Sequence, residues 1–164
     1  MKTYSIAAIP ADGIGPEVIS AGVRVLHALA KRQGDIDFAV QTFEWGSDYY
    51  KAHGVMMPED GLAQLKNFDA IYFGAVGAPD VPDHITLWGL RLPICQGFDQ
   101  YANVRPTKIL PGIQSPLRKA GPGTLDWVIV RENSEGEYSG HGGRAHKGLP
   151  EEVGTEVAIF TRTG

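Results

Sequence analysis

The sequence predicts an α/β fold with a largely parallel sheet. Two apolar runs of strand length, Tyr4–Ile9 and Ala70–Val76, each lead into a glycine-containing turn. A segment with apolar residues at helical spacing lies between them. Strands that alternate with helices are typical of parallel sheets, because a helical crossover brings the chain back to start the next strand in the same direction.

The elements of the N-terminal region follow in order from turn and helix signals. Pro16 suits the first position of a helix, and Gly34 suits the residue that ends one. Between them, apolar residues recur at helical spacing at Ile19, Val23, Leu26 and Ala30. A second strand is predicted at Phe38–Phe43, and Pro58–Asp60 opens a short helix that carries Leu62 and Leu65.

The C-terminal region has a different character. Strands are predicted at Tyr101–Leu110, Trp127–Val130 and Thr155–Thr161. The polar, glycine-rich segment Gly136–Gly148 predicts a protruding hairpin arm. The change of pattern predicts two lobes, residues 1–98 and residues 99–164.

Composition excludes several classes of protein. The chain has 164 residues, of which 43% are hydrophobic and 21% charged, as in ordinary soluble domains. Its apolar runs are too short to cross a bilayer and its N-terminus lacks the pattern of a signal peptide, so we expect no membrane partner and a cytoplasmic location. A net charge of −4 with scattered basic residues argues against a nucleic-acid partner. The single cysteine, Cys95, excludes an internal disulfide and a multi-cysteine zinc site.

Two arginines and a tyrosine near the ends of predicted strands are candidate site residues. A guanidinium presents a rigid fork of donors that matches a carboxylate, so Arg105 and Arg131 suggest a small substrate with more than one carboxylate. Tyr138 adds a hydroxyl that can deliver a proton. On residue types alone, structural ion pairs and a hairpin aromatic remain an open alternative.

Four motifs, taken in order, resemble the β-hydroxyacid oxidative decarboxylases, the family of isocitrate and isopropylmalate dehydrogenases. The motifs are Ala11–Glu17, Gly74–Gly77, Asn103–Pro106 and Val130–Gly136. The glycine turn in the first motif is weak on its own, because it falls short of a dinucleotide fingerprint. The succession of all four over most of the chain is far more specific. Two further segments, Asp83–Leu90 and Phe98–Tyr101, are similar to the tartrate and D-malate branch.

The resemblance implies roles for these residues. Arg105 and Arg131 match the family's substrate-carboxylate arginines, and Tyr138 matches its acid in decarboxylation. It also implies NAD, a divalent metal (Mn²⁺ or Mg²⁺), a monovalent cation as an optional addition to that metal, and a homodimer. The family's catalytic lysine, metal-binding aspartates and adenosine loop would lie beyond Gly164. The chain therefore resembles the N-terminal half of such an enzyme, and we expect no metal ligand within it.

One departure from the family pattern concerns substrate choice. Cys95 stands where the family normally has another arginine, and Arg91 lies one helical turn earlier. Arg91 is a candidate to supply the missing carboxylate contact, and a solvated helix arginine is the alternative. Ile14 and His84 are candidate cofactor-binding residues, although a lone exposed histidine is usually an ordinary surface residue.

These observations predict NAD-dependent oxidation and decarboxylation of a small 2-hydroxy dicarboxylic acid, tartrate or D-malate, with help from a metal. The alternatives are a 3-isopropylmalate dehydrogenase, which a charged Arg91 and Cys95 disfavour, and a non-catalytic truncated fragment of such an enzyme.

Overall fold

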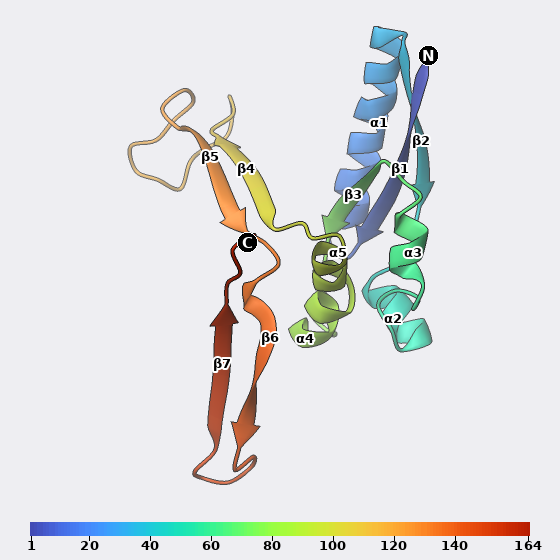
Figure 1. Cartoon of the computed structure of the whole chain (residues 1–164). Helices are drawn as coiled ribbons and strands as arrows, with labels where there is room; N and C mark the ends of the chain where they lie inside the picture. Colours follow the sequence, from blue (N-terminus) through green and yellow to red (C-terminus); the bar gives the residue numbers. More distant parts are fainter. The chain divides into compact units, whose positions relative to one another are not determined.

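The computed structural model describes residues 1–164, which form two compact units, Met1–Ile94 and Cys95–Gly164. The first unit contains a three-stranded parallel sheet in the order β2-β1-β3 (Figure 1). Its strands are β1 (Lys2–Ala11), β2 (Ile36–Thr42) and β3 (Ala70–Ala75). This parallel sheet with intervening helices confirms the predicted α/β class. None of the helices combines the length and apolar character that a membrane crossing requires.

Helix α1 (Gly15–Gln33) connects β1 to β2 and packs against all three strands. Pro16 lies in its first turn together with Glu17, whose negative charge suits a helix N-terminus. The helix ends at Gly34, which adopts φ 79° and donates its N–H to the Ala30 carbonyl. Both predicted boundary signals are therefore confirmed.

Shorter helices complete the first unit. They are α2 (Ser47–His53), α3 (Gly61–Leu65), α4 (Asp83–Thr86) and the π-helical segment η1 (Leu87–Arg91), and η1 continues into α5 (Leu92–Gly97). The short helix predicted after Pro58 is α3. Helix α2 and the π-helical turn were not predicted, because neither carries a distinctive apolar period.

The core of the first unit surrounds its central strand. Ile6–Ile9 in β1 are buried, because β1 has a neighbour on each side and helices against the sheet. Leu90 and Leu92 from the η1–α5 junction are almost wholly buried as well. The Phe43 ring centroid lies 4.6 Å from that of Trp45 and 5.5 Å from that of Phe68, so these aromatic rings form a satellite cluster.

Two glycines allow the backbone after β1 to approach β3 closely. A Cβ atom on Gly74 would clash with the Pro10 carbonyl oxygen and lie 3.0 Å from the Gly15 Cα atom. A Cβ atom on Gly15 would clash with the same oxygen and lie 3.0 Å from the Ala75 nitrogen. The clashing groups are backbone atoms, which cannot move aside without distorting the sheet.

Gly74→Ala is therefore expected to destabilise the protein by about 3 kcal/mol, the upper end of the usual cost of overpacking. Urea denaturation of the full-length gene product measures the shift in midpoint. Gly54→Ala is the matched control, because Gly54 has φ 77° and no atom near its missing Cβ, so that change introduces backbone strain alone. Equal shifts for the two variants would contradict the close approach.

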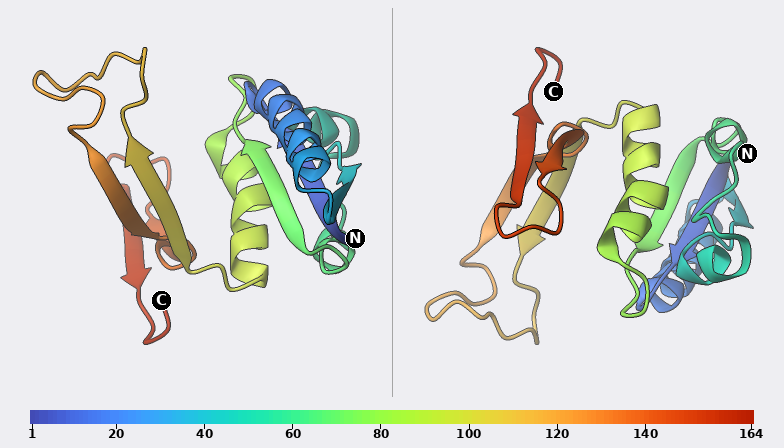
Figure 2. Two further views of the ribbon diagram at one scale, coloured as in Figure 1. Left: turned by 90° about the horizontal axis from the view of Figure 1, so that it is seen from above. Right: turned by 90° about the horizontal axis from the view of Figure 1, so that it is seen from below.

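The second unit contains two antiparallel strand pairs, and Figure 2 draws its ribbon from above and from below. One pair joins β4 (Ala102–Lys108) to β5 (Asp126–Glu132), and the other joins β6 (Gly136–Ala145) to β7 (Val153–Ile159). The three predicted strands are confirmed with shifted ends. The glycine-rich arm is a hairpin, as predicted, and its first side is strand β6.

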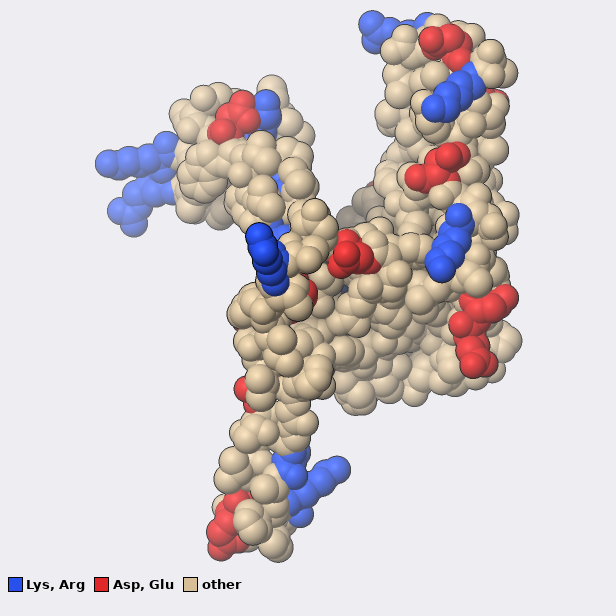
Figure 3. All heavy atoms as spheres, viewed as in Figure 1, with Lys and Arg blue, Asp and Glu red and all other residues tan.

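Charged side chains of both signs are spread over the face drawn in Figure 3, and Lys and Arg form no continuous stripe there. Ion pairs between Lys108 and Asp126 across β4 and β5, and between Arg144 and Glu152 in the arm, join oppositely charged neighbours.

Candidate functional site

Arg105 and Arg131 lie on the same face of the β4–β5 pair. Arg131 is paired directly with Asn103, and Arg105 is paired with Ile129. Side chains of directly paired residues point to the same face, and alternate residues along a strand share that face. The two arginines are therefore diagonal neighbours, close enough for long side chains to act on one ligand.

The side chains of Tyr138 and Arg131 are in direct contact. A guanidinium N–H of Arg131 donates a hydrogen bond to the Tyr138 hydroxyl oxygen, and the guanidinium carbon lies 5.5 Å from the centre of the tyrosine ring. Both side chains are half-buried, whereas Arg105 is exposed. The structure thus brings Arg131 and Tyr138 into direct contact and places Arg105 on the adjoining diagonal position.

The turn between β5 and β6 makes this contact possible. The Glu132 carboxylate accepts the backbone N–H groups of Ser134 at 2.7 Å and Glu135 at 2.6 Å, which closes the turn. The Tyr138 N–H then donates to the Glu135 carbonyl at 3.0 Å. A carboxylate that accepts backbone N–H groups in this way stabilises a tight turn. Glu132 is a positioning residue that the sequence analysis did not single out.

Further polar contacts, of which those of Asn133 are buried, anchor the same turn. Asn133 is buried, and its amide nitrogen donates to the Gln100 carbonyl at 2.9 Å and contacts the Cys95 sulfur at 3.3 Å. The Gln96 amide nitrogen donates to the Tyr138 carbonyl at 2.7 Å. Cys95, at the position where the family pattern has an arginine, is therefore a buried packing residue that supports the turn beneath Arg131 and Tyr138.

Glu135 ties this turn to the chain after β7. Its two carboxylate oxygens accept the Thr161 hydroxyl at 2.6 Å and the Thr161 N–H at 2.7 Å. These hydrogen bonds, with the hydroxyl contributing most, hold the pKa of Glu135 below its ordinary value of 4.5. A lowered pKa means that the tie stabilises the fold above the ordinary value and is lost as the pH falls through the lowered one.

Thr161→Val removes the hydroxyl donor, and we expect it to raise the pKa of Glu135 toward its ordinary value. An NMR titration of the Glu135 side-chain carboxyl carbon in both proteins measures the change. Thr163→Val is the control, because Thr163 donates no hydrogen bond to Glu135. An unchanged Glu135 pKa in Thr161→Val would contradict the assigned cause.

The other sequence-predicted candidates belong to the first unit and lie on separate elements. Ile14 is 61% exposed in the turn between β1 and α1. His84 is exposed on α4 and lines a cavity of about 500 Å³ with Trp88 and Met57. Arg91 is half-buried at the end of η1. The cofactor roles of Ile14 and His84 and the substrate role of Arg91 stay predictions.

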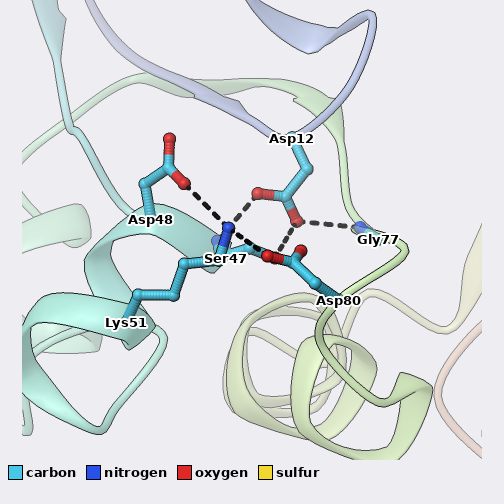
Figure 4. A network of polar contacts seen from close by, with 6 residues as sticks. All are labelled: Asp12, Ser47, Asp48, Lys51, Gly77 and Asp80. Carbon is cyan, nitrogen blue, oxygen red and sulfur yellow. Dashed lines mark hydrogen bonds and ion pairs between the residues drawn. The ribbon is translucent and has the colours of Figure 1, made fainter.

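A buried carboxylate near Ile14 escaped the sequence analysis. Asp12 is only 7% exposed and accepts three hydrogen bonds from Ser47 and Gly77 (Figure 4). It lies just beyond the carboxyl end of β1, where Gly77 follows β3. In the strand order β2-β1-β3 the strands that follow β1 lie on opposite sides of it, so the order of connection reverses at β1, and open α/β sheets bind ligands at such a switch point. Asp12 lies in the motif Ala11–Glu17, but its Asp-Gly pair is also common in ordinary turns and gave no sign of the partners at Ser47 and Gly77.

No group of three or more His, Cys, Asp or Glu side chains lies close enough in this structure to hold a metal ion. The residues present therefore do not form a metal site by themselves.

Comparison with known proteins gives a consistent picture. The family model described as isocitrate/isopropylmalate dehydrogenase matches residues 5–164. A protein of Agrobacterium vitis named probable tartrate dehydrogenase/decarboxylase is 82% identical over this whole chain, which covers 46% of that protein. The D-malate dehydrogenase (decarboxylating) of Escherichia coli strain K12 is 54% identical over the whole chain, which again covers 46% of the relative.

Solved structures agree with the fold. An isocitrate dehydrogenase from Methylococcus capsulatus superimposes with a TM-score of 0.73 at 25% identity, over 97% of this chain and 43% of that one. The chain thus spans just under half the length of the relatives it matches. Because the family model covers nearly every residue from the first strand to the end, the chain belongs to the isocitrate/isopropylmalate dehydrogenase family.

Proposed function

We propose that the full-length gene product oxidises and decarboxylates a small 2-hydroxy dicarboxylic acid, tartrate or D-malate, with NAD as the oxidant. The observation that carries the proposal is the contact between Arg131 and Tyr138 on the face shared with Arg105. The names of the 82% and 54% identical relatives, a tartrate dehydrogenase/decarboxylase and a D-malate dehydrogenase, support the same choice.

The arginines suit a dianionic substrate. Arg131 uses one N–H group on the Tyr138 oxygen and has further donors in the same planar fork for a carboxylate. Arg105, on the diagonal position, provides a second fork for the same or the other carboxylate. Half-burial of Arg131 strengthens its interaction with an anion, because less water screens the charge.

Tyr138 suits the role of a proton donor. Its oxygen accepts the Arg131 N–H through a lone pair, and a phenol hydroxyl can act chemically as both an acceptor and a proton donor. In the proposed reaction a general base elsewhere in the full-length protein would take the proton of the substrate hydroxyl, and NAD, when bound, would accept the hydride from the same carbon. The resulting keto acid loses CO₂ and leaves an enolate, whose carbon takes a proton from Tyr138. Arg131 would hold both the substrate carboxylate and the donor oxygen during that transfer.

The turn after β1 fits the close approach of a dinucleotide. Ile14 is exposed at the carboxyl ends of the strands, and a Cβ atom on the preceding Gly13 would have no atom within 4 Å, so the turn is open on that side. NAD would supply the hydride acceptor there. The divalent metal implied by the family, Mn²⁺ or Mg²⁺, finds no ligand set among these residues, so we assign it none of them.

The wider organisation remains part of the proposal. We assign residues 1–98 to a cofactor-side domain and residues 99–164 to the start of a domain for substrate binding and dimerisation. The full-length gene product would act as a homodimer, which light scattering during size-exclusion chromatography would detect. A cytoplasmic location stays a prediction.

The test compares NADH formation by the purified full-length gene product on D-malate, tartrate and 3-isopropylmalate, with Mn²⁺ present. We expect kcat/KM for D-malate or tartrate to exceed that for 3-isopropylmalate by at least about 10-fold, because the apolar side chain would meet charged groups. A preference for 3-isopropylmalate would overturn the substrate choice, and a preference for NADP over NAD would overturn the cofactor choice. No turnover with any of the three would favour a non-catalytic role.

A further inference from the structure

One carboxylate joins three segments at the carboxyl edge of the parallel sheet. The Asp12 Oδ1 atom accepts the Ser47 N–H at 2.7 Å. Its Oδ2 atom accepts the Ser47 hydroxyl at 2.8 Å and the Gly77 N–H at 2.8 Å. Figure 4 shows Asp12 between the start of α2 and the loop after β3. The backbone adds to this link, because the Asp12 N–H donates to the Ala75 carbonyl at 2.6 Å.

The backbone around Asp12 is held in conformations that residues rarely adopt unaided. Ala11 has φ 55°, a left-handed value that costs energy for a residue with a Cβ atom. Gly46 has φ 145°, and a Cβ atom on it would lie 2.9 Å from Asp12 Oδ1 and 3.0 Å from the Ala11 Cα atom. Backbone strain of this kind persists only where surrounding contacts fix it, and it is concentrated at functional sites.

A second contact joins α2 to the loop after β3 at the surface. The Lys51 ammonium lies 2.8 Å from Asp80 and 3.3 Å from Asp48. The hydrogen bond with Asp80 is the largest cause of the raised pKa of Lys51, and the hydrogen bond with Lys51 is the largest cause of the lowered pKa of Asp80. Both groups are therefore charged at neutral pH. The loop after β3 is fixed to α2 at two levels, buried at Asp12 and exposed at Lys51.

We propose that Asp12 is a positioning residue, which holds the β1–α1 turn at Ile14 and the loop at Gly77 in the form that receives the dinucleotide. This inference rests on the proposed function. Asp12 would act through the two loops, whose exposed backbone lies at the switch point, rather than by touching the cofactor. Only a carboxylate serves here, because its two oxygens accept from two backbone N–H groups and one hydroxyl at once.

Asp12→Asn tests the inference with almost no change in shape. An amide has one acceptor oxygen, so it can accept from only one of the Ser47 and Gly77 N–H groups and leaves the other facing an NH₂ group. In the full-length gene product we expect the KM for NAD to rise by about 10-fold, the cost of one buried unsatisfied group. The KM for D-malate and the kcat at saturating NAD should stay within about 3-fold of the parent values.

Asp69→Asn is the matched control at the opposite, amino-terminal end of the parallel strands. Asp69 Oδ2 accepts the Ser5 N–H at 2.7 Å and the Ser5 hydroxyl at 2.8 Å, so it also links an aspartate to a serine. These residues lie at the amino ends of β1 and β3, away from the switch point. Asp69→Asn should lower the melting temperature without changing the KM for NAD.

Ser47→Ala and Ser5→Ala form a second, milder pair in case Asp12→Asn does not fold. Each removes one hydroxyl donor and leaves the backbone hydrogen bonds in place. We expect the KM for NAD to rise about 3-fold in Ser47→Ala and to stay unchanged in Ser5→Ala, since loss of one hydroxyl donor costs less than leaving a buried N–H group without an acceptor.

The outcomes separate the two proposals. A parent protein that reduces no NAD overturns the proposed function and this inference with it. An active parent in which Asp12→Asn leaves the KM for NAD unchanged overturns the inference alone. Equal effects of Asp12→Asn and Asp69→Asn on that KM would assign Asp12 to general stability and would likewise overturn the inference. If Asp12→Asn does not fold, equal KM values for NAD in Ser47→Ala and Ser5→Ala would overturn the inference.

Discussion

Replacing Arg131 by Lys is expected to lower kcat/KM for D-malate by about 30- to 900-fold, which corresponds to about 2–4 kcal/mol. Lysine keeps the positive charge but loses the planar fork that binds a carboxylate through two parallel hydrogen bonds. It would also lose the N–H group that Arg131 donates to the Tyr138 hydroxyl. Substrate binding and orientation of the proton donor should therefore fail together.

Two further arginine-to-lysine substitutions serve as comparisons for Arg131→Lys. Arg105→Lys should reduce kcat/KM in the same direction but by less, because Arg105 is exposed and water screens its charge. Arg144→Lys is the control, since Arg144 forms an exposed ion pair with Glu152 at 2.7 Å in the arm. Steady-state kinetics and a melting curve on each variant separate loss of function from loss of folding. Parent-like kcat/KM in both Arg105→Lys and Arg131→Lys would remove the carboxylate assignment.

Tyr138→Phe is expected to lower the rate of forming the decarboxylated, protonated product by about 100-fold or more, the usual contribution of a positioned acid. The KM for D-malate should change little, because the phenyl ring keeps its place beside Arg131. The keto acid that still carries both carboxylates should account for a larger share of the product. Absorbance measures NADH, and chromatography of the quenched reaction measures the two keto acids.

Tyr101→Phe provides the comparison for that experiment. Tyr101 is 44% exposed just before β4, so loss of its hydroxyl should leave both the rate and the ratio of keto acids unchanged. If Tyr138→Phe also left both unchanged, Tyr138 would not be the acid.

Local sequence signals were sufficient for most elements of the fold. The first helix was predicted because Pro16, Gly34 and the apolar residues between them act within one segment. Helix α2 was not, because its start depends on hydrogen bonds from Ser47 to Asp12, 35 residues earlier in the chain. The π-helical turn at Leu87–Arg91 carries no residue pattern that distinguishes it from an ordinary helix, so it was not predicted.

The candidate site shows the same contrast between features that local sequence predicts and features that depend on hydrogen bonds formed in the folded chain. The proximity of Arg131 and Tyr138 followed from a strand end and a hairpin separated by a short turn. The residues that fix this turn, Glu132 and Asn133, act through backbone hydrogen bonds that residue types do not reveal. Asp12 is a stronger example, since its partners come from two other segments of the chain.

The two-stranded β4–β5 pair has a practical consequence for handling this chain in isolation. Each strand pairs on one side only, so β5 offers a row of unpaired N–H and C=O groups along its outer edge. Trp127, Val128 and Val130 on that strand are 56%, 66% and 68% exposed. A long apolar edge of this kind is a template for strand addition by another molecule. Concentrated solutions of the 164-residue chain should therefore cloud through intermolecular sheet formation, and thioflavin fluorescence over time would follow the growth of these aggregates.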